Sequence, residues 1–263
     1  REAARLARAG FRRPLTVEHK GEVDLVTRFD RESERLLRER LGAALPYALV
    51  GEEEGGATSS ADGTALFLDP IDGTTNFVHG HPFWCVSVGL VERGAPVLGV
   101  IVAPALGLEW HGWVSEDGER RAYRRGLGEP AEVEECAVST TARFEDALLA
   151  TGFPYDRRTS PDNNFDAFVA IKRKCQAVRR CGSAALDLCL VADGTYDGYW
   201  EKKLRPWDIA GGAALVRAAG GRVTDFQRGP SFLASGHVVA TNGALHEALL
   251  EELAQVAARS ATG

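Results

Sequence analysis

Several features that would place this chain in a membrane or a secreted scaffold are missing from its 263 residues. No apolar run reaches the roughly 20 residues that a membrane-spanning helix needs, and no signal-peptide pattern is present. The five cysteines follow neither a disulfide nor a metal-binding spacing. We therefore expect a cytoplasmic protein with reduced, buried cysteines. Because the sequence contains no Met, we expect the native start to lie before Arg1.

Positive charge is also scarce. The chain has 31 Lys and Arg residues and 37 Asp and Glu residues, which give a formal net charge of −6. This balance argues against a nucleic-acid surface, which needs clustered basic residues. An acidic cleft also repels a phosphate ester unless bound cations reverse the local sign. The 44% hydrophobic and 26% charged content is ordinary for a globular protein, and the length suits one large domain or two closely packed halves.

The densest chemical signal is residues 69–80, which read Asp-Pro-Ile-Asp-Gly-Thr-Thr-Asn-Phe-Val-His-Gly. They follow a short apolar run at residues 65–68, which predicts a buried strand. Asp69 and Asp72 are therefore expected just past a strand end, where open α/β sheets bind ligands. Gly73 permits close approach of backbone to a ligand, and the Thr-Thr-Asn that follows is typical of a helix start. The pattern fits a divalent metal bridged to a phosphate, with an ordinary solvated turn as the alternative.

Hydrophobic periodicity predicts alternating helices and strands over the rest of the chain. Helices are expected at residues 1–10, 31–44, 163–174, 183–192, 206–219 and 244–258. Strands are expected at residues 47–50, 65–68, 83–91, 97–102, 108–114, 148–151, 177–179, 194–200, 222–224 and 238–240. Residues 19–30 suggest a hairpin or extended segment, and the charged residues 115–135 predict no clear element. This order gives a layered α/β sandwich in which the strands from 83 to 114 are antiparallel neighbours.

Three further acids stand far from the central motif in sequence. Glu52 and Glu53 end the strand at residues 47–50, and Asp208 opens the helix that begins at Pro206. Taken alone, Asp208 is typical of a helix cap or first-turn acid. Scattered acids are more often surface charge than ligands, so these residues alone leave both interpretations open.

The string at residues 69–80 resembles the signature of the inositol monophosphatase family, and the segments that contain Glu52 and Asp208 stand in the family's order. This resemblance covers nearly the whole chain. It implies an αβαβα sandwich of the sugar-phosphatase type, with mixed and largely antiparallel sheets. It also implies a single catalytic unit with halves of about 1–137 and 138–263, a homodimer, and sensitivity to Li⁺.

The resemblance further implies Mg²⁺ as cofactor, with two or three ions in each active site. Glu52, Asp69 and the Ile71 carbonyl would hold one ion. Asp69, Asp72 and Asp208 would hold a second, and a third, weaker ion would lie near Glu52. Ligands that are all oxygen suit Mg²⁺. One ion would lower the pKa of the attacking water while the other stabilises the leaving oxygen.

For proton transfer, the resemblance points to Thr74 backed by Asp30, with Glu52 close to the attacking water. A threonine hydroxyl scarcely ionises, so Thr74 is expected to orient the water and relay its proton. The implied catalytic residues are Glu52, Thr74, Asp30 and Asp72, and the implied supporting residues are Lys20 and Glu53. As isolated residues, Lys20 and Asp30 would be solvated surface charges.

For the substrate, the resemblance implies that the N–H groups of Gly73 and Thr74 hold the phosphate. The Ala184 backbone, the Glu201 carboxylate and Asp208 would contact the rest of the molecule. Lys202 and Lys203 are unusual beside Glu201. They either form a solvated loop or favour a more acidic substrate.

We therefore expect a Mg²⁺-dependent phosphatase that hydrolyses phosphate monoesters, with myo-inositol 1-phosphate as the first candidate substrate. Histidinol phosphate, fructose 1,6-bisphosphate and nucleotide phosphates are the alternatives within this class. A different alternative is a transcription-machinery binding role in which catalysis is dispensable. We expect no membrane partner and regard nucleic acid as an unfavoured one.

Overall fold

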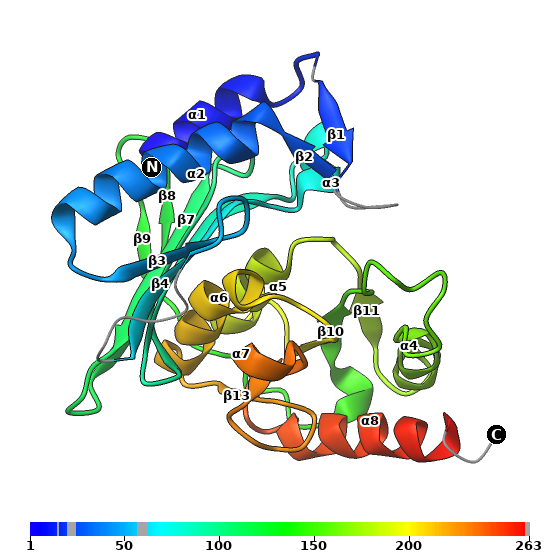
Figure 1. Cartoon of the computed structure of the whole chain (residues 1–263). Coiled ribbons are helices and arrows are strands. Elements are labelled where there is room, and N and C mark those ends of the chain that lie inside the picture. Colours follow the sequence, from blue (N-terminus) through cyan, green and yellow to red (C-terminus); the bar gives the residue numbers. More distant parts are fainter. Residues whose placement is uncertain (15, 20–24, 57–62, 261–263) are drawn as a thin grey trace.

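The computed structural model describes residues 1–14, 16–19, 25–56 and 63–260, and it forms five layers (Figure 1). Helices α1 (Glu2–Gly10) and α2 (Arg28–Ala44) cover the outer face of the larger sheet. Helices α5 (Ala184–Ala192) and α6 (Pro206–Ala218) lie between the two sheets. Helices α4 (Phe165–Lys172) and α8 (His246–Ser260) cover the outer face of the smaller one. This confirms the predicted αβαβα sandwich with mixed sheets.

Over the residues that the structure describes, the larger sheet has seven strands in sequence order. They are β3 (Ala48–Gly51), β4 (Thr64–Asp72), β5 (Cys85–Glu92), β6 (Ala95–Ala103), β7 (Leu108–Val114), β8 (Arg120–Gly126) and β9 (Val133–Glu135). Only the β3–β4 pair is parallel, and all later pairs are antiparallel. Strands β5, β6 and β7 agree with the expected antiparallel neighbours.

The smaller sheet has five strands in the order β11-β10-β12-β14-β13. They are β10 (Leu148–Thr151), β11 (Ala177–Arg179), β12 (Gly198–Glu201), β13 (Arg222–Thr224) and β14 (Val238–Thr241). Its first two pairs are parallel and its last two are antiparallel. The remaining short elements are the β1 (Val17–His19) and β2 (Leu25–Thr27) hairpin, α3 (Thr74–Val78), a 3₁₀ turn at Phe144–Asp146, and α7 (Phe232–Ser235).

Several local details differ from what the sequence predicted. Residues 115–135 contain β8 and β9. The sequence did not predict β8 because it is mostly charged, and within β8 only Ala122 is buried. Helix α2 begins at Arg28 rather than residue 31, because Thr27 and Asp30 form a capping box there. The short helix α7 was not expected at all.

Glycines bring α6 directly onto the larger sheet. A Cβ atom on Gly89 of β5 would lie 2.4 Å from the backbone nitrogen of Gly211 on α6. A Cβ on Gly99 of β6 would lie 2.1 Å from the Gly211 carbonyl oxygen. Since Asp208 stands in the first turn of α6, this contact also sets where that carboxylate can lie relative to β4.

An aromatic cluster supports the segment that follows β4. Phe77 of α3 packs edge-on against Trp84, with ring centroids 4.9 Å apart, and Phe11 and Phe29 pack beside them. Phe77 and Trp84 are fully buried. The cluster therefore fixes the turn between Asp72 and α3 against both N-terminal helices. Among the described residues, no helix combines the length and the apolar character needed to span a membrane.

Candidate functional site

A pocket of about 950 Å³ opens where the end of β4 meets the N-termini of α5 and α6. Most of the predicted site residues line it. They are Glu52, Asp69, Ile71, Asp72, Gly73, Thr74, Ala184, Glu201 and Asp208. Asp30 does not line the pocket but contacts Thr74, and Lys20 lies outside the described residues.

The two central acids lie within β4 and not beyond its end, so the expected strand limit was wrong. Asp69 pairs with Ser87 and Asp72 pairs with Cys85, with a register shift between them. Pro70 lacks an N–H group and is accommodated in this irregular stretch. Asp69 Oδ1 accepts a 3.0 Å hydrogen bond from the Ile71 N–H. The bulge thus turns both carboxylates into the pocket.

Asp72 is held from the other half of the molecule. Its Oδ2 accepts hydrogen bonds from the Ser183 hydroxyl at 2.6 Å and the Ala185 N–H at 2.7 Å. Burial raises the pKa of Asp72 to about 6, and these donors oppose that rise. The sequence indicated Ser183 as the start of a helix near the substrate but not its bond to Asp72.

Asp69 and Asp208 share one electrostatic environment. Burial first, and then the charges of Glu52, Asp72 and Asp208, hold the pKa of Asp69 well above its usual range. Loss of solvation and the charges of Asp72 and Glu52 do the same to the pKa of Asp208. Asp208 also accepts a 2.8 Å bond from the Arg205 N–H, so it is a first-turn cap as well as a pocket acid. Burial and the neighbouring carboxylates thus both disfavour the charged forms of these acids.

The chemistry of this donor set fits a hard divalent cation, because every donor is an oxygen and the acids destabilise one another when charged. As they stand, no three His, Cys, Asp or Glu side chains of the described residues are close enough together to form a metal centre. The acids line the same pocket but do not surround a common point closely enough to bind an ion. The predicted ligand roles of Glu52, Asp69, Ile71, Asp72 and Asp208 therefore stay predictions.

Thr74 and Asp30 are in contact, as the resemblance implied. The Thr74 hydroxyl lies 3.2 Å from Asp30 Oδ1 and 3.0 Å from the Ile71 carbonyl oxygen, and it can donate to either. Asp30 is fully buried and its Oδ2 also accepts from the N–H and hydroxyl of Thr27. Asp30 is therefore no solvated surface charge.

Position 73 needs a glycine because of its backbone conformation. Its φ of 94° is left-handed, and an added Cβ would lie 3.1 Å from the carbonyl oxygens of Gly182 and Phe83. Gly73 caps α3, which begins at Thr74. The predicted phosphate contact of these two N–H groups stays a prediction.

Further polar groups line the same pocket. Burial raises the pKa of Glu201 to about 7, while the hydroxyl of Tyr199 donates to its Oε2 and opposes the rise. A Cβ on Gly152 would lie 2.0 Å from the Glu201 carboxylate, so only glycine leaves room for it. Asp187 is a buried acid on this wall that sequence reasoning missed, and burial holds its pKa well above its usual range. Arg180 also lines the wall.

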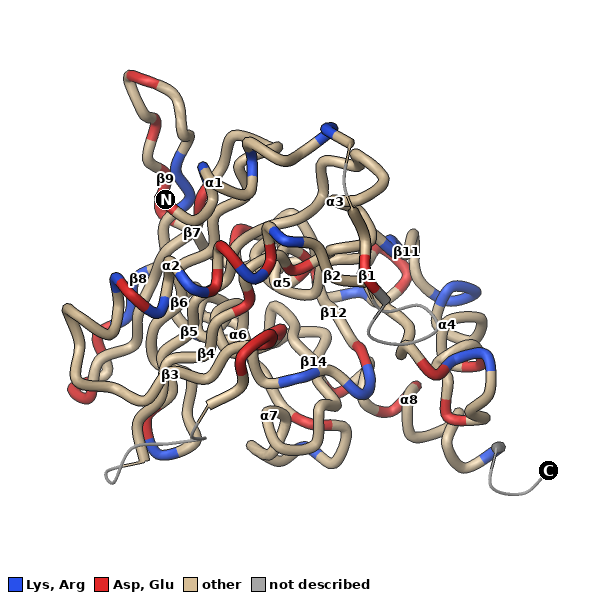
Figure 2. Tube along the Cα trace, turned by 45° about the horizontal axis from the view of Figure 1, so that its top comes forward, with Lys and Arg blue, Asp and Glu red and all other residues tan. Residues whose placement is uncertain are grey.

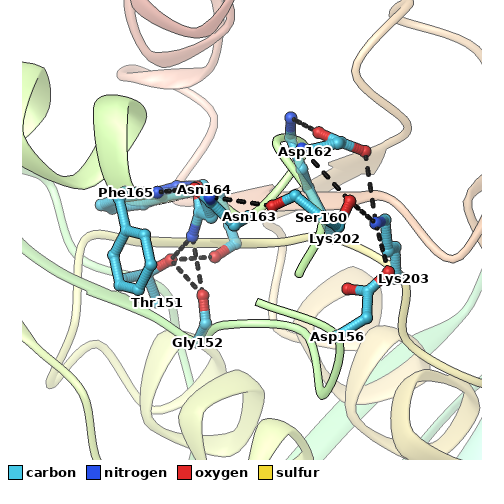
Figure 3. A network of polar contacts seen from close by, with 11 residues as sticks. Thr151, Gly152, Asp156, Ser160, Asp162, Asn163, Asn164, Phe165, Lys202 and Lys203 are labelled. Atoms are coloured by element: carbon cyan, nitrogen blue, oxygen red, sulfur yellow. Dashed lines mark hydrogen bonds and ion pairs between the residues drawn. The ribbon is translucent and has the colours of Figure 1, made fainter. Parts of the chain in front are cut away.

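Lys202 and Lys203 are bound to a loop from another segment (Figure 3). The ammonium group of Lys202 pairs with Asp162, and that of Lys203 lies 2.8 Å from Asp156 Oδ2 and 3.0 Å from the Ser160 hydroxyl. Asp156 and both lysines line the pocket. The lysines are therefore not a simple solvated loop, because they join one rim of the pocket to a neighbouring segment. A preference for a more acidic substrate stays a prediction.

This chain matches known proteins over most of its length. The model of the inositol monophosphatase family matches residues 1–258. The chain is 40% identical over 242 residues to an inositol-1-monophosphatase of Synechocystis, covering 90% of this chain and 80% of that protein. It is 37% identical over 241 residues to the Nus factor SuhB of Pseudomonas aeruginosa, covering 90% and 85%.

Solved structures give the same result. The Thermotoga maritima IMPase superposes with a TM-score of 0.83 at 30% identity, over 98% of this chain and 94% of that one. The inositol monophosphatase of Anabaena superposes with a TM-score of 0.73 at 38% identity, over 86% of each chain. This chain belongs to the inositol monophosphatase family.

Proposed function

We propose that this protein is a Mg²⁺-dependent phosphate monoesterase whose most favoured substrate is myo-inositol 1-phosphate. The observation that carries the proposal is the convergence of Glu52, Asp69, Asp72 and Asp208 on one pocket. These acids come from β4, α6 and the turn after β3, and the same pocket holds Thr74. The match to relatives that bear the name inositol-1-monophosphatase supports it.

In this proposal, Glu52, Asp69 and the Ile71 carbonyl hold one Mg²⁺, and Asp69, Asp72 and Asp208 hold another. When bound, the ions supply positive charge for the phosphate and acidify a water molecule. The carboxylates must be deprotonated to bind a cation, so their raised pKa values make cation binding release protons.

The chain's own part in the reaction is to orient groups and accept a proton. Thr74 can present its hydroxyl oxygen to a water molecule while its own hydrogen points to Asp30 Oδ1. Asp30 is held in place by Thr27, which leaves Oδ1 directed at Thr74. A proton taken from the water can thus pass to the Asp30 carboxylate or to Glu52.

Polyol recognition falls to Glu201 and Asp187, together with Asp208 beside the proposed metal ligands. Their carboxyl groups offer several oxygen acceptors in the pocket, which suits a ring that carries many hydroxyl donors. Histidinol phosphate, fructose 1,6-bisphosphate and nucleotide phosphates remain the competing substrates, since their phosphates would use the same acids. The homodimer, the third ion, Li⁺ sensitivity and the cytoplasmic location also remain predictions from the resemblance.

The test is phosphate release from each of these esters by the metal-stripped protein, with and without added Mg²⁺. We expect hydrolysis only with Mg²⁺, and the largest kcat/KM for myo-inositol 1-phosphate. Asp69→Asn should reduce kcat by at least about 100-fold, because one removed charge affects both proposed ions. Equal hydrolysis before and after chelation contradicts the metal-dependent mechanism, and a large preference for histidinol phosphate contradicts the substrate.

A second candidate is binding to transcription machinery, favoured by the relatives named Nus factor SuhB. Against it, acidic and basic positions are mixed along α2, and the basic positions of the described residues form no continuous stripe in the view of Figure 2. Capture of antitermination factors or RNA polymerase by both the wild type and Asp72→Asn supports this role. Absence of capture by the wild type contradicts it.

A further inference from the structure

Glu34 is a buried carboxylate that the proposed chemistry does not use. It lies on α2 with no exposed surface, one turn after Asp30. Residues four apart on a helix project from the same face. This face of α2 therefore carries both Asp30, which contacts Thr74, and a second acid directed at another part of the site.

Glu34 binds the backbone of the turn that carries Glu52. Its Oε2 accepts a 2.7 Å hydrogen bond from the Glu53 N–H, and its Oε1 accepts one of 3.0 Å from the Glu54 N–H. The turn closes on itself through paired backbone hydrogen bonds between Gly51 and Gly55. Both carboxylate oxygens thus fix the two amides that directly follow Glu52.

The residues around the Glu34 carboxylate leave space for it and balance its charge. A Cβ on Gly51 would lie 2.0 Å from Glu34 Oε1, so any larger residue at position 51 would displace the acid. Arg38, one turn further along α2, donates to Oε1 at 2.9 Å and to the Leu49 carbonyl oxygen at 3.2 Å. The arginine supplies the positive charge that a buried carboxylate needs.

We propose that Glu34 is a positioning residue for the metal site, which sets where the Glu52 carboxylate lies by holding the amides of Glu53 and Glu54. This inference rests on the proposed function, because it takes Glu52 as a cation ligand. Groups that orient a ligand without touching the ion commonly change metal affinity 10- to 100-fold when altered. Through α2, the position of Glu52 is tied to that of Asp30 and Thr74.

The test is calorimetric titration of the metal-stripped full chain with Mg²⁺, together with hydrogen exchange at the amides of Glu53 and Glu54. We expect Glu34→Gln and Glu34→Asp to weaken Mg²⁺ binding about tenfold and to speed exchange at both amides. The glutamine offers only one acceptor oxygen, and the aspartate is too short to reach both amides. Gly51→Ala, which displaces the acid without removing it, should have the same effect.

Asp225→Asn is the matched control. Asp225 is also buried, and its Oδ1 accepts from two turn amides, those of Gln227 at 2.9 Å and Gly229 at 2.7 Å, but it does not line the pocket. We expect Asp225→Asn and the Glu34 variants all to lower Tm, because each loses hydrogen bonds to buried turn amides. Only Asp225→Asn should keep its Mg²⁺ affinity within twofold of the wild type.

The outcomes separate this inference from the proposed function. If Glu52→Gln binds Mg²⁺ as tightly as the wild type, the proposed metal site is wrong. If Glu52→Gln loses affinity but Glu34→Asp and Gly51→Ala keep it within twofold, the metal site stands and the role of Glu34 is overturned. These two variants retain the charge that pairs with Arg38, so they decide the matter even if Glu34→Gln does not fold.

Discussion

The Ser183 hydroxyl and the Asp72 carboxylate are joined by a hydrogen bond of 2.6 Å, although 111 residues separate them in the sequence. Ser183 caps α5, between the two sheets, and Asp72 ends β4 of the larger sheet. The bond therefore connects the element that presents Ala184 to the strand that presents the central acids. Neither partner could form this contact in a folded half alone.

Replacing Ser183 with Ala should raise the pKa of Asp72 above about 6, because a donor to its charged form is lost. A hydrogen bond to a charged group contributes about 1.5–3 kcal/mol, so Mg²⁺ affinity and kcat/KM should fall roughly 10- to 100-fold at neutral pH. Ser139→Ala is the control, since that hydroxyl also donates at 2.6 Å to a buried acid, Asp197, away from the pocket. Equal activity of the two variants contradicts the prediction.

Asp30 combines a helix cap with a contact to Thr74, and two variants separate these roles. Thr27→Ala removes the cap partner and should lower the free energy of unfolding by about 1 kcal/mol, with kcat reduced less than fivefold. Asp30→Asn weakens the proton acceptor beside Thr74 and should lower kcat by about 100-fold. Chemical denaturation and steady-state kinetics measure the two effects. A similar loss of kcat in both variants would show that Asp30 acts only through the helix.

The lysine pairs at the pocket rim should control the loop that lines it. Lys202→Ala combined with Lys203→Ala removes ion pairs to Asp156 and Asp162. Such partly exposed pairs contribute only up to about 1 kcal/mol each, so global stability should change little. Hydrogen exchange in residues 155–162 should nevertheless accelerate, and KM should rise several-fold with kcat unchanged. Lys174→Ala, which removes an ion pair with Glu252 away from the pocket, should change neither quantity.

The raised pKa of Glu201 predicts how the stability of the metal-free protein depends on pH. Its folded-state pKa of about 7 lies above the ordinary value of 4.5, so the folded state binds more protons between these limits. The free energy of unfolding contributed by this group is fully present below about pH 4.5 and is lost as pH rises through 7, by up to about 3 kcal/mol. Glu201→Gln should flatten the decline between pH 5 and 7. Glu251→Gln, on the exposed side of α8, should leave it unchanged.

Local sequence patterns predicted elements best where apolar residues recur at a fixed period. The strands β5 to β7 were found from their runs of apolar residues. The helices α5 and α6 were found because they are apolar along most of their length and are buried on nearly all sides. The strand β8 was not predicted, because its pairing with β7 makes it a strand and its own composition does not. The limit of β4 was misplaced for a related reason, since Asp69 and Asp72 extend the strand only by pairing with β5.

The sequence by itself supplied the acids that line the pocket, which are Glu52, Asp69, Asp72 and Asp208, and the resemblance to a recognisable family. Only the tertiary structure decided that Ser183 donates to Asp72, that Glu34 accepts from the two amides after Glu52, and that Lys202 and Lys203 pair with acids of the rim loop. The physical reason is that such partners act through single hydrogen bonds and ion pairs between distant segments. These contacts leave no periodic or compositional trace along the chain, whereas backbone conformation and burial do.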